Sequence, residues 1–300
     1  MSKLEITHRH SAIINKLKKH PASLKEIERH LEQESEIRGC ILTSTSKTFK
    51  RDLEDIFSLY HCDIQYNRAN NEYYIKSTEE DTINNRMLEA FNTFNALNSS
   101  VGYNEYVEFE ETASNGSENF HGILHAIKNK VVLKINYQSY WSSTTRERNV
   151  KPYFLKEFKN LWYLIGQDID KDEIRTFALD RMKSIEITRK KFVYPVEEEP
   201  KSYFDNCYGI ISGDQRKPVE AVVLSFHPFQ GKYVKSMPLH SSQKIVKDTD
   251  EELVIKLYVY PTFDFEMQLL SYGPLVQVLK PVELRDTIKE KLKKALENYR

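Results

Sequence analysis

The spacing of the apolar residues changes twice along this chain, and these changes limit the folds that it can adopt. Over the first 60 residues apolar side chains recur every three or four positions, which is typical of amphipathic helices. From residue 120 they alternate with polar residues in several short stretches, which is typical of strands, and the last 20 residues return to helical spacing. Because 300 residues can form two or three hydrophobic cores, we expect an α+β protein of several domains.

Residues 1–76 predict three helices followed by a hairpin. HSAIINKLKK predicts the first helix, and SLKEIERHL predicts the second, with Ser23 and Glu26 spaced as a capping box. SKTFKRDLEDIFSLY predicts a third helix that is capped by Thr45 or Ser46. HCDIQYNRANNEYYI then predicts two strands joined by a turn at 67–71. Three helices and a hairpin are the layout of a winged helix-turn-helix, so we predict a DNA-binding domain over 1–76.

Residues 77–118 predict a linker. Residues 79–97 have helical spacing, and the resulting apolar stripe needs a partner, either a neighbouring domain or a second copy of the chain. Residues 98–118 are polar and acidic, which is typical of a connecting segment, with one short strand predicted at 106–109.

The remaining residues predict two further domains. Over 119–195 a short helix precedes the strands VVLKINYQ, RNVKPYFLKEF, NLWYLIGQ and EIRTFALDRMKSIEIT, which suggests a small antiparallel β-barrel. Over 196–300 the predicted elements follow the order β-α-β-β-α-β of a ferredoxin-like unit, and VELRDTIKEKLKKALENY predicts a final helix. We therefore predict a barrel domain and a C-terminal α/β extension.

The formal net charge of zero hides an uneven distribution. Residues 119–192 contain 15 Lys and Arg against 8 Asp and Glu, whereas residues 76–118 contain 2 against 9. A basic domain suits an anionic partner such as a phosphate or a nucleic acid. Charge spread evenly over a solvated surface explains the same count equally well.

The sequence carries no sign of a membrane segment, a disulfide framework or a catalytic site. No apolar run approaches the roughly 18 residues that a membrane helix needs. Cys40, Cys62 and Cys207 are widely spaced, so we expect free thiols and a cytoplasmic protein. Phosphate-loop, dinucleotide-binding, zinc-protease and serine-hydrolase motifs are absent, and His227 and His240 have no acidic or cysteine partner at ligand spacing. We therefore expect no enzyme, no metal site and no cofactor.

TSTSKTFKRD, at the start of the third predicted helix, combines hydroxyls with basic side chains. A recognition helix meets DNA at its N-terminal end, where hydroxyls and free amides bind phosphates and lysines reach base edges. Arg51, which precedes Asp52, suits either DNA or a clamp to a neighbouring helix. Any capped amphipathic helix in a three-helix bundle has a similar pattern. Because a wing-like hairpin follows, we predict DNA binding by Thr45, Ser46, Lys47, Thr48, Lys50 and Arg51.

EIRTFALDRM places Arg175, Phe177, Leu179 and Arg181 at every other position, and alternate residues of a strand share a face. Inside a small barrel that face would be core, which an unpaired arginine does not tolerate. Either the arginines lie at the ends of the barrel and reach water, or they line a groove that receives an anion. The sequence supports both explanations.

These residues also resemble a known family. Trp162-Tyr163-Leu164 is the signature tripeptide of WYL-domain transcriptional regulators, and RERNVKPYFL and RTFALDR resemble the motifs that flank it. HPFQGKYVKSMPLHSSQKIV and LLSYGPLVQVLKPVELR resemble the C-terminal extension of the family, in the manner of its Bacteroidetes members. TFKRDLEDI resembles the recognition segment of its helix-turn-helix. The resemblance covers essentially the whole chain.

The resemblance implies a winged helix-turn-helix, a linker helix, a Sm-like barrel and a C-terminal extension. It implies a dimeric regulator whose barrel senses a nucleotide or a single-stranded nucleic acid. The basic residues that carry the effector in this family match Arg148, Arg175 and Arg181 here, and Tyr137 stands where a polar or aromatic ligand contact is expected. Trp162 and Leu164 are better explained as packing residues.

We therefore predict a homodimer whose third helix occupies the major groove of an operator and whose barrel responds to an anionic effector. The segment 77–118 would relay the response between protomers. Two features concern the details of DNA contact: a long connection, QESEIRGCILTST, between the second and third helices, and Lys47 where the family often has Arg. An alternative is an accessory module of a nuclease or helicase defence system, which binds nucleic acid without an operator of its own.

Overall fold

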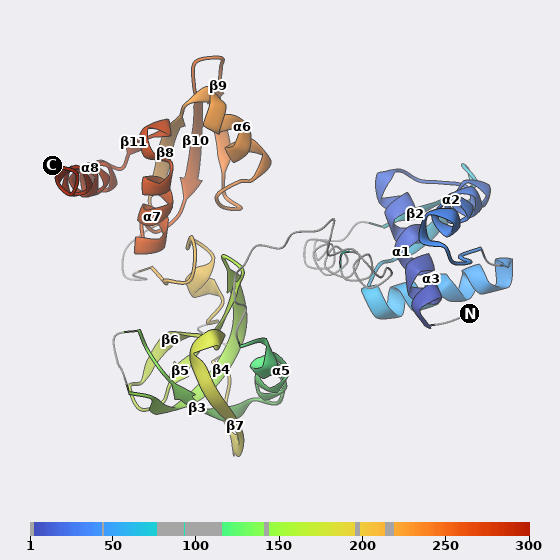
Figure 1. Ribbon diagram of the computed structural model, residues 1–300, viewed down its shortest axis with the longest axis horizontal. Coiled ribbons are helices and arrows are strands. Elements are labelled where there is room, and N and C mark those ends of the chain that lie inside the picture. The colour runs from blue at the N-terminus through green and yellow to red at the C-terminus, as the bar shows by residue number, and fades with distance from the viewer. Residues whose placement is uncertain are drawn as a thin grey trace. The chain divides into compact units, whose positions relative to one another are not determined.

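The computed structural model describes residues 3–43, 45–76, 93, 116–140, 144–195, 199–213 and 219–300. The chain forms two compact units, Met1–Glu111 and Thr112–Arg300. Figure 1 shows their helices and strands, and each unit is built around buried apolar residues of its own. The helix predicted at 79–97 and the strand predicted at 106–109 fall almost entirely outside the described residues.

The N-terminal unit contains the three predicted helices and the hairpin. The helices are α1 (Lys3–Lys19), α2 (Leu24–Arg38) and α3 (Ser46–Tyr60), and the strands β1 (Ile64–Asn67) and β2 (Glu72–Ile75) pair antiparallel. Ser23 and Glu26 form the predicted capping box at α2, and Thr45 caps α3. Backbone hydrogen bonds between Ala22 and Tyr73, 2.8 and 3.0 Å long, join the hairpin to the connection between α1 and α2.

The second helix is longer than its sequence pattern predicted, and the connection to α3 is correspondingly shorter. Residues 33–38 of the supposed connection belong to α2, which ends only where Gly39 adopts a left-handed conformation with φ of 62°. An ion pair between Arg38 and Glu34, with Nε 2.8 Å from Oε2, supports this last turn. The apolar stripe fades after Leu31, so the pattern alone gave no sign of the extra turns.

The second unit begins with a five-stranded antiparallel sheet. Helix α5 (Phe120–Asn129) precedes β3 (Val131–Tyr137), β4 (Arg146–Phe158), β5 (Leu161–Asp168), β6 (Glu173–Ala178) and β7 (Met182–Lys191), which pair in the order β6-β5-β4-β3-β7. Helix α5 contacts β3, β4 and β7. The buried side chains between the helix and the sheet form a core of Ile123, Ala126, Val131, Leu133, Ile135, Val150, Leu164, Phe177, Leu179 and Met182.

The prediction of one strand through EIRTFALDRMKSIEIT is wrong. Strand β6 ends at Ala178, a 3₁₀ turn spans Leu179–Arg181, and β7 begins at Met182. The turn carries the chain from one edge of the sheet to the other, because β6 pairs with β5 whereas β7 pairs with β3. Arg175 and Arg181 therefore do not share a strand face. The turn contains neither Gly nor Pro, so the apolar alternation runs through it unbroken in the sequence.

Gly116 packs against this turn. Its φ is +102°, and a Cβ added there would lie 2.4 Å from the backbone carbon of Leu179 and 2.6 Å from the backbone nitrogen of Asp180. Only glycine combines that conformation with so close an approach. Gly116 is thus in close contact with the turn that carries Arg181.

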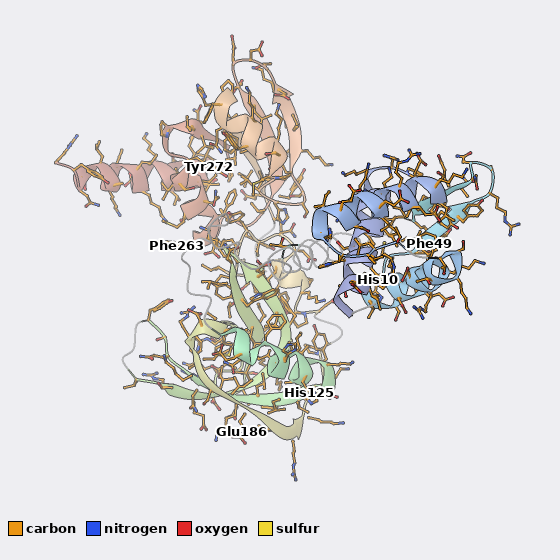
Figure 2. The ribbon with its side chains drawn as sticks, turned by 45° about the vertical axis from the view of Figure 1, so that its right-hand side comes forward. His10, Phe49, His125, Glu186, Phe263 and Tyr272 are labelled. Atoms are coloured by element: carbon orange, nitrogen blue, oxygen red, sulfur yellow. The ribbon has the colours of Figure 1, made fainter. Side chains whose placement is uncertain are left out.

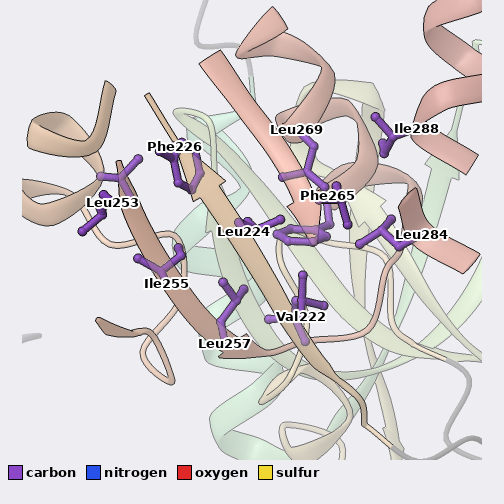
Figure 3. Close-up of a cluster of buried hydrophobic side chains, with 13 residues drawn as sticks. Val222, Leu224, Phe226, Leu253, Ile255, Leu257, Phe265, Leu269, Leu284 and Ile288 are labelled. Carbon is purple, nitrogen blue, oxygen red and sulfur yellow. The ribbon is translucent and has the colours of Figure 1, made fainter. Parts of the chain in front are cut away.

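The last part of the chain forms a four-stranded antiparallel sheet with helices on one face. The elements are β8 (Ala221–Phe226), α6 (Pro228–Ser236), β9 (Lys244–Asp248), β10 (Leu253–Tyr258), α7 (Phe263–Ser271), β11 (Val276–Lys280) and α8 (Val282–Glu297). They confirm the predicted β-α-β-β-α-β order and final helix, and the strands pair in the order β11-β8-β10-β9. Figure 3 shows apolar side chains of β8 and β10 packed against those of α7 and α8.

Candidate functional site

The residues predicted to contact DNA lie on the first turns of α3. Ser46, Lys47, Lys50 and Arg51 are exposed, and Phe49 between them points into the core (Figure 2). The Oγ1 atoms of Thr45 and Thr48 lie 3.0 Å apart, and Thr45 Oγ1 accepts a hydrogen bond from the Thr48 amide at 3.3 Å. The two threonines are therefore used in capping, while the serine and the three basic side chains remain available to a partner.

The clamp between α3 and its neighbour is made by Asp52 and not by Arg51. Asp52 is fully buried and accepts hydrogen bonds from Nε and Nη2 of Arg9, each at 2.7 Å, and Nε2 of His10 lies 3.1 Å from Oδ1. Burial alone would raise the pKa of Asp52, but the hydrogen bonds from His10 and Arg9 outweigh it and lower that pKa. Arg51 is exposed, which leaves it on the outer face of α3.

A basic cavity of about 360 Å³ opens at one end of the five-stranded sheet. Three of the four predicted effector residues line it: Tyr137, Arg148 and Arg175. Arg146 and Lys171 add two further positive charges, and Ser139, Thr144 and Thr176 add hydroxyls. None of the described lining residues is acidic. The cavity therefore presents four cations and several hydrogen-bond donors to whatever enters it.

The pairing of the strands explains why these cations converge. Arg148 stands opposite Ile135, and Arg146 stands opposite Tyr137, so both arginines extend the row of core residues on β3 and β4. Arg175 pairs with Gly166 on β5, and Gly166 lies two residues before Asp168 in the sequence. Directly paired residues share a face of a sheet. The apolar core face thus continues, at this end, into a charged rim.

One buried carboxylate lies beneath two of the cavity's arginines. Asp168 is fully buried, and its Oδ2 lies 3.5 Å from Nη1 of Arg175 and 3.7 Å from Nη1 of Arg148. Its Oδ1 accepts a hydrogen bond from the amide of Asp170 at 3.2 Å. A single negative charge therefore orients two guanidinium groups and neutralises only part of their charge.

Arg181 does not line the cavity but lies beside it. Its guanidinium carbon is 4.5 Å from the ring centre of Tyr140 and 5.5 Å from that of Tyr137, a stacked arrangement between two aromatic rings. The hydroxyl of Tyr137 accepts a hydrogen bond from the amide of Ala178 at 3.3 Å. Burial raises the pKa of Tyr137, against the smaller opposing effect of Arg181. Tyr137 thus connects the cavity to the turn that carries Arg181.

Two protein-family models match parts of this chain. Residues 118–187 match the family model of the WYL domain, and residues 218–296 match that of the WCX domain. The cavity lies within the part of the chain that matches the WYL model, and the four-stranded sheet that follows lies within the part that matches the WCX model.

Among the solved structures that align with this chain, two are aligned over 98% of its length. One is proteasome accessory factor B/C (PafBC) of Arthrobacter aurescens, with 19% identity and a TM-score of 0.36 over 98% of this chain and 47% of that one. The chain thus spans about half the length of that protein. The other is a CRISPR Cas-related protein, with 11% identity and a TM-score of 0.40 over 98% of this chain and 84% of that one. The search of curated proteins gave no match.

The tripeptide that is characteristic of the WYL domain serves packing in this chain. Leu164 is fully buried in the core between α5 and the sheet. Trp162 packs edge-on against Phe120, with ring centres 4.9 Å apart, and Tyr163 belongs to a second buried cluster on the opposite face. None of the three lines the basic cavity.

Sequence reasoning missed Arg146, Lys171 and Asp168. Arg146 stands two residues before Arg148 in RERNVKP, so strand alternation could have placed both on one face. Lys171 lies in the turn after β5, where no pattern indicated its direction. Asp168 looked like the first residue of an acidic turn, and its burial depends on its pairing with Val150.

The histidines singled out in the sequence have ordinary hydrogen-bond partners. His227 Nδ1 accepts from the amide of Phe229 at 3.3 Å, and His240 lies 2.8 Å from both the Ser242 hydroxyl and the Asp205 carbonyl. Within the described ranges, His10, Asp52 and Asp55 form the only grouping with metal-ligand spacing, and two of them already contact each other beside Arg9. Among the same residues, no helix is both long and apolar enough to cross a membrane.

Proposed function

We propose that this protein is a DNA-binding transcriptional regulator whose WYL domain senses an anionic nucleotide or nucleic-acid effector. The basic cavity is the observation that carries the proposal. Arg146, Arg148, Lys171 and Arg175 surround a space of about 360 Å³, which falls within the range of small-molecule sites. Planar guanidinium groups bind phosphate oxygens in pairs, so several arginines in one cavity favour a phosphorylated ligand.

The charge of the cavity supports a ligand with more than one negative charge. Asp168 offsets one of the four cations, and its two guanidinium contacts of 3.5 and 3.7 Å are longer than a good hydrogen bond. An entering phosphate can therefore recruit Arg148 and Arg175 without the loss of a strong internal pair. Hydroxyls from Ser139, Thr144 and Thr176 supply further donors for phosphate or sugar oxygens.

The N-terminal unit supplies a surface for DNA. Its three helices and hairpin support a winged helix-turn-helix, in which α3 is the recognition helix and the hairpin is the wing. Lys47, Lys50 and Arg51 are exposed on the first turns of α3, while Phe49 and Asp52 fix the opposite side of the helix. This arrangement suits a helix that lies in the major groove of a palindromic operator, bound by a homodimer.

The effector acts through its difference in affinity for two states of the protein. A route for that coupling begins at the cavity. Tyr137 lines it and stacks with Arg181, whose turn rests against Gly116 at the entry of the domain. A ligand that shifts Tyr137 or Arg181 thus acts on the segment that joins the sensor to the DNA-binding unit.

Titration calorimetry of the full-length protein with mononucleotides, dinucleotides and short oligonucleotides tests the sensor. Arg148→Gln with Arg175→Gln is expected to abolish the binding of mononucleotides and dinucleotides, whereas Lys128→Gln with Lys190→Gln removes the same charge from the outside of the domain and is expected to preserve it. Adding Asp168→Asn to the first pair restores internal charge balance, so continued loss of binding would exclude misfolding as the cause. Unchanged binding in the cavity variants would contradict the proposal.

Footprinting on genomic fragments tests the proposed binding to an operator. Specific protection upstream of the protein's own gene that survives moderate salt, and that is lost in Lys47→Gln with Lys50→Gln, is expected for a regulator. Binding that is equal on all fragments and weakens steeply with salt would favour the accessory module without an operator.

A further inference from the structure

The WCX sheet presents an open face that carries a row of lysines. Its core residues point toward α7 and α8, so the alternate residues of each strand point to the other side (Figure 3). A bulge between Val278 and Lys280 breaks the alternation of β11, so that Lys280 pairs with Val223 on β8. Val223 in turn pairs with Lys256 on β10, and Lys256 pairs with Lys244 on β9. We call these three side chains the lysine row. Paired strands lie about 4.8 Å apart, so the row spans roughly 14 Å across the sheet.

The lysine row has no internal counter-charge. Lys244 and Lys280 are exposed, Lys256 is half-buried, and none of the three forms an ion pair within the described parts of the chain. Nearby lysines behave differently: Lys247 lies 2.7 Å from Glu252, and Lys235 lies 2.9 Å from Asp248. Like charges directly opposite each other on a sheet are destabilising. Because the lysine row retains like charges on neighbouring strands, it suits a ligand whose negative charges are arranged in a line.

An exposed aromatic ring lies next to the row. Tyr258 stands two residues after Lys256 on the same face of β10 and is 40% exposed, and the Lys256 ammonium lies 5.0 Å from its ring centre. The pKa of the Tyr258 hydroxyl is lowered by hydrogen bonding from Lys256 and then by the charges of Lys256 and Lys244. The direction of this shift reflects the positive potential of the face. In the neighbouring row Gln277 adds a polar group, whereas the hydroxyl of Ser225 donates a hydrogen bond to Glu252.

We propose that this face of the WCX domain binds a single-stranded nucleic acid, with its phosphates along the lysine row and a base stacked on Tyr258. A linear set of cations beside an aromatic ring matches the way in which proteins bind single strands without reading their sequence. An unpaired base is required, because bases of a duplex do not offer a free face for stacking. This site uses residues of β8 to β11 and is separate from the cavity on β3 to β6, so it goes beyond the effector site proposed above.

Fluorescence anisotropy of the full-length protein with labelled oligothymidylate and oligouridylate of about 15 nucleotides tests this proposal. The row variant is Lys244→Gln, Lys256→Gln, Lys280→Gln. Its matched control removes three exposed lysines of α8: Lys289→Gln, Lys293→Gln, Lys294→Gln. Because each phosphate contact on a single strand contributes roughly 0.7 to the slope of log affinity against log salt, the row variant is expected to lower that slope by about 2. The control is expected to leave it unchanged.

Two measurements make the result specific to this face. An oligonucleotide with 4-thiothymidine is expected to crosslink to Tyr258 in the wild type and in Arg148→Gln with Arg175→Gln, but not in Tyr258→Leu. Inorganic phosphate at the same total charge is expected to compete poorly, since it cannot span the row. Equal salt slopes in the row variant and its control, or crosslinks that map only to the WYL cavity, would overturn the proposal and leave the effector site untouched.

Discussion

Arg9 and Asp52 meet inside the N-terminal unit with no exposed surface on either side chain, and two hydrogen bonds of 2.7 Å join them. Arg9 lies on α1 and Asp52 on α3, so this pair fixes the rotation of α3 about its axis. That rotation decides which side of α3 faces outward, and the outward side carries Lys47, Lys50 and Arg51. The surface that we propose for DNA binding therefore depends on a buried contact on the opposite side of α3.

Asp52→Ala is expected to destabilise the N-terminal unit by about 3–5 kcal/mol, because it removes the carboxylate that accepts two hydrogen bonds from the buried Arg9 guanidinium. Hydrogen exchange of the full-length protein, read on the amides of α1 and α3, measures this loss without interference from the other unit. Glu54→Ala removes an exposed carboxylate of the same helix and is expected to change little. Equal protection in both variants would show that the buried pair contributes nothing.

The N-terminal unit is expected to lose stability as the pH falls from 7.5 toward 5.5. Burial, and then the charge of Arg38, lowers the pKa of His8 below 6.5. The unfolded chain therefore takes up a proton near pH 6.5 that the folded unit does not, so stability is constant above that pH and declines below it. Hydrogen exchange across this range in His8→Leu should show a shallower decline. Burial also lowers the pKa of His30, so some pH dependence remains. An identical decline in the variant would rule out His8.

Arg148 and Arg175 are expected to be coupled through Asp168. Each single variant leaves Asp168 with one arginine beside it, so Arg148→Gln and Arg175→Gln should each lower the free energy of unfolding by only about 1 kcal/mol. The double variant leaves the buried carboxylate without either arginine and should lower the free energy of unfolding by clearly more than the sum. Denaturation followed by tryptophan fluorescence, to which Trp141 and Trp162 both contribute, measures all three. Asp168→Asn added to the double variant should recover much of the loss. Additive effects would mean that the carboxylate does not link the two arginines.

Trp162 and Leu164 are expected to affect folding and not ligand binding. Leu164→Ala removes a fully buried side chain and should cost about 2–5 kcal/mol, whereas Trp162→Ala, at a partly exposed site against Phe120, should cost less. Calorimetric titration with whichever nucleotide binds the wild type should give the same affinity in the folded fraction of both variants. A weaker affinity in Trp162→Ala alone would place the indole in the ligand site.

Local signals in the sequence predicted the elements well. The Ser23 capping box, the Thr45 cap and the order of strands and helices in the last 80 residues all depend on neighbours within a few positions, and such neighbours are visible in a sequence. The end of α2 was missed because it is fixed by the Glu34–Arg38 pair and by Gly39, after the apolar stripe has faded.

The candidate cavity was predicted only in part, because strand register assembles it. Arg148 and Arg175 were identified through motifs, but the sequence did not show that Asp168 would lie beneath both. Arg181 was assigned to the same face as Arg175 on the assumption of one continuous strand. The turn at Leu179–Arg181 separates the two, and it depends on contacts with Gly116, more than 60 residues earlier in the chain.

The position of Gly116 determines where a chimeric protein can join the proposed sensor domain to another sequence. A chimera that joins the residues matching the WYL model to a different N-terminal unit at residue 118 would omit Gly116, which packs against the Leu179–Arg181 turn. A junction upstream of Gly116 would carry the contact along. The unit that can be transferred therefore begins slightly before the residues that match the WYL model. Recombination between such proteins would be tolerated only if the break lies upstream of Gly116.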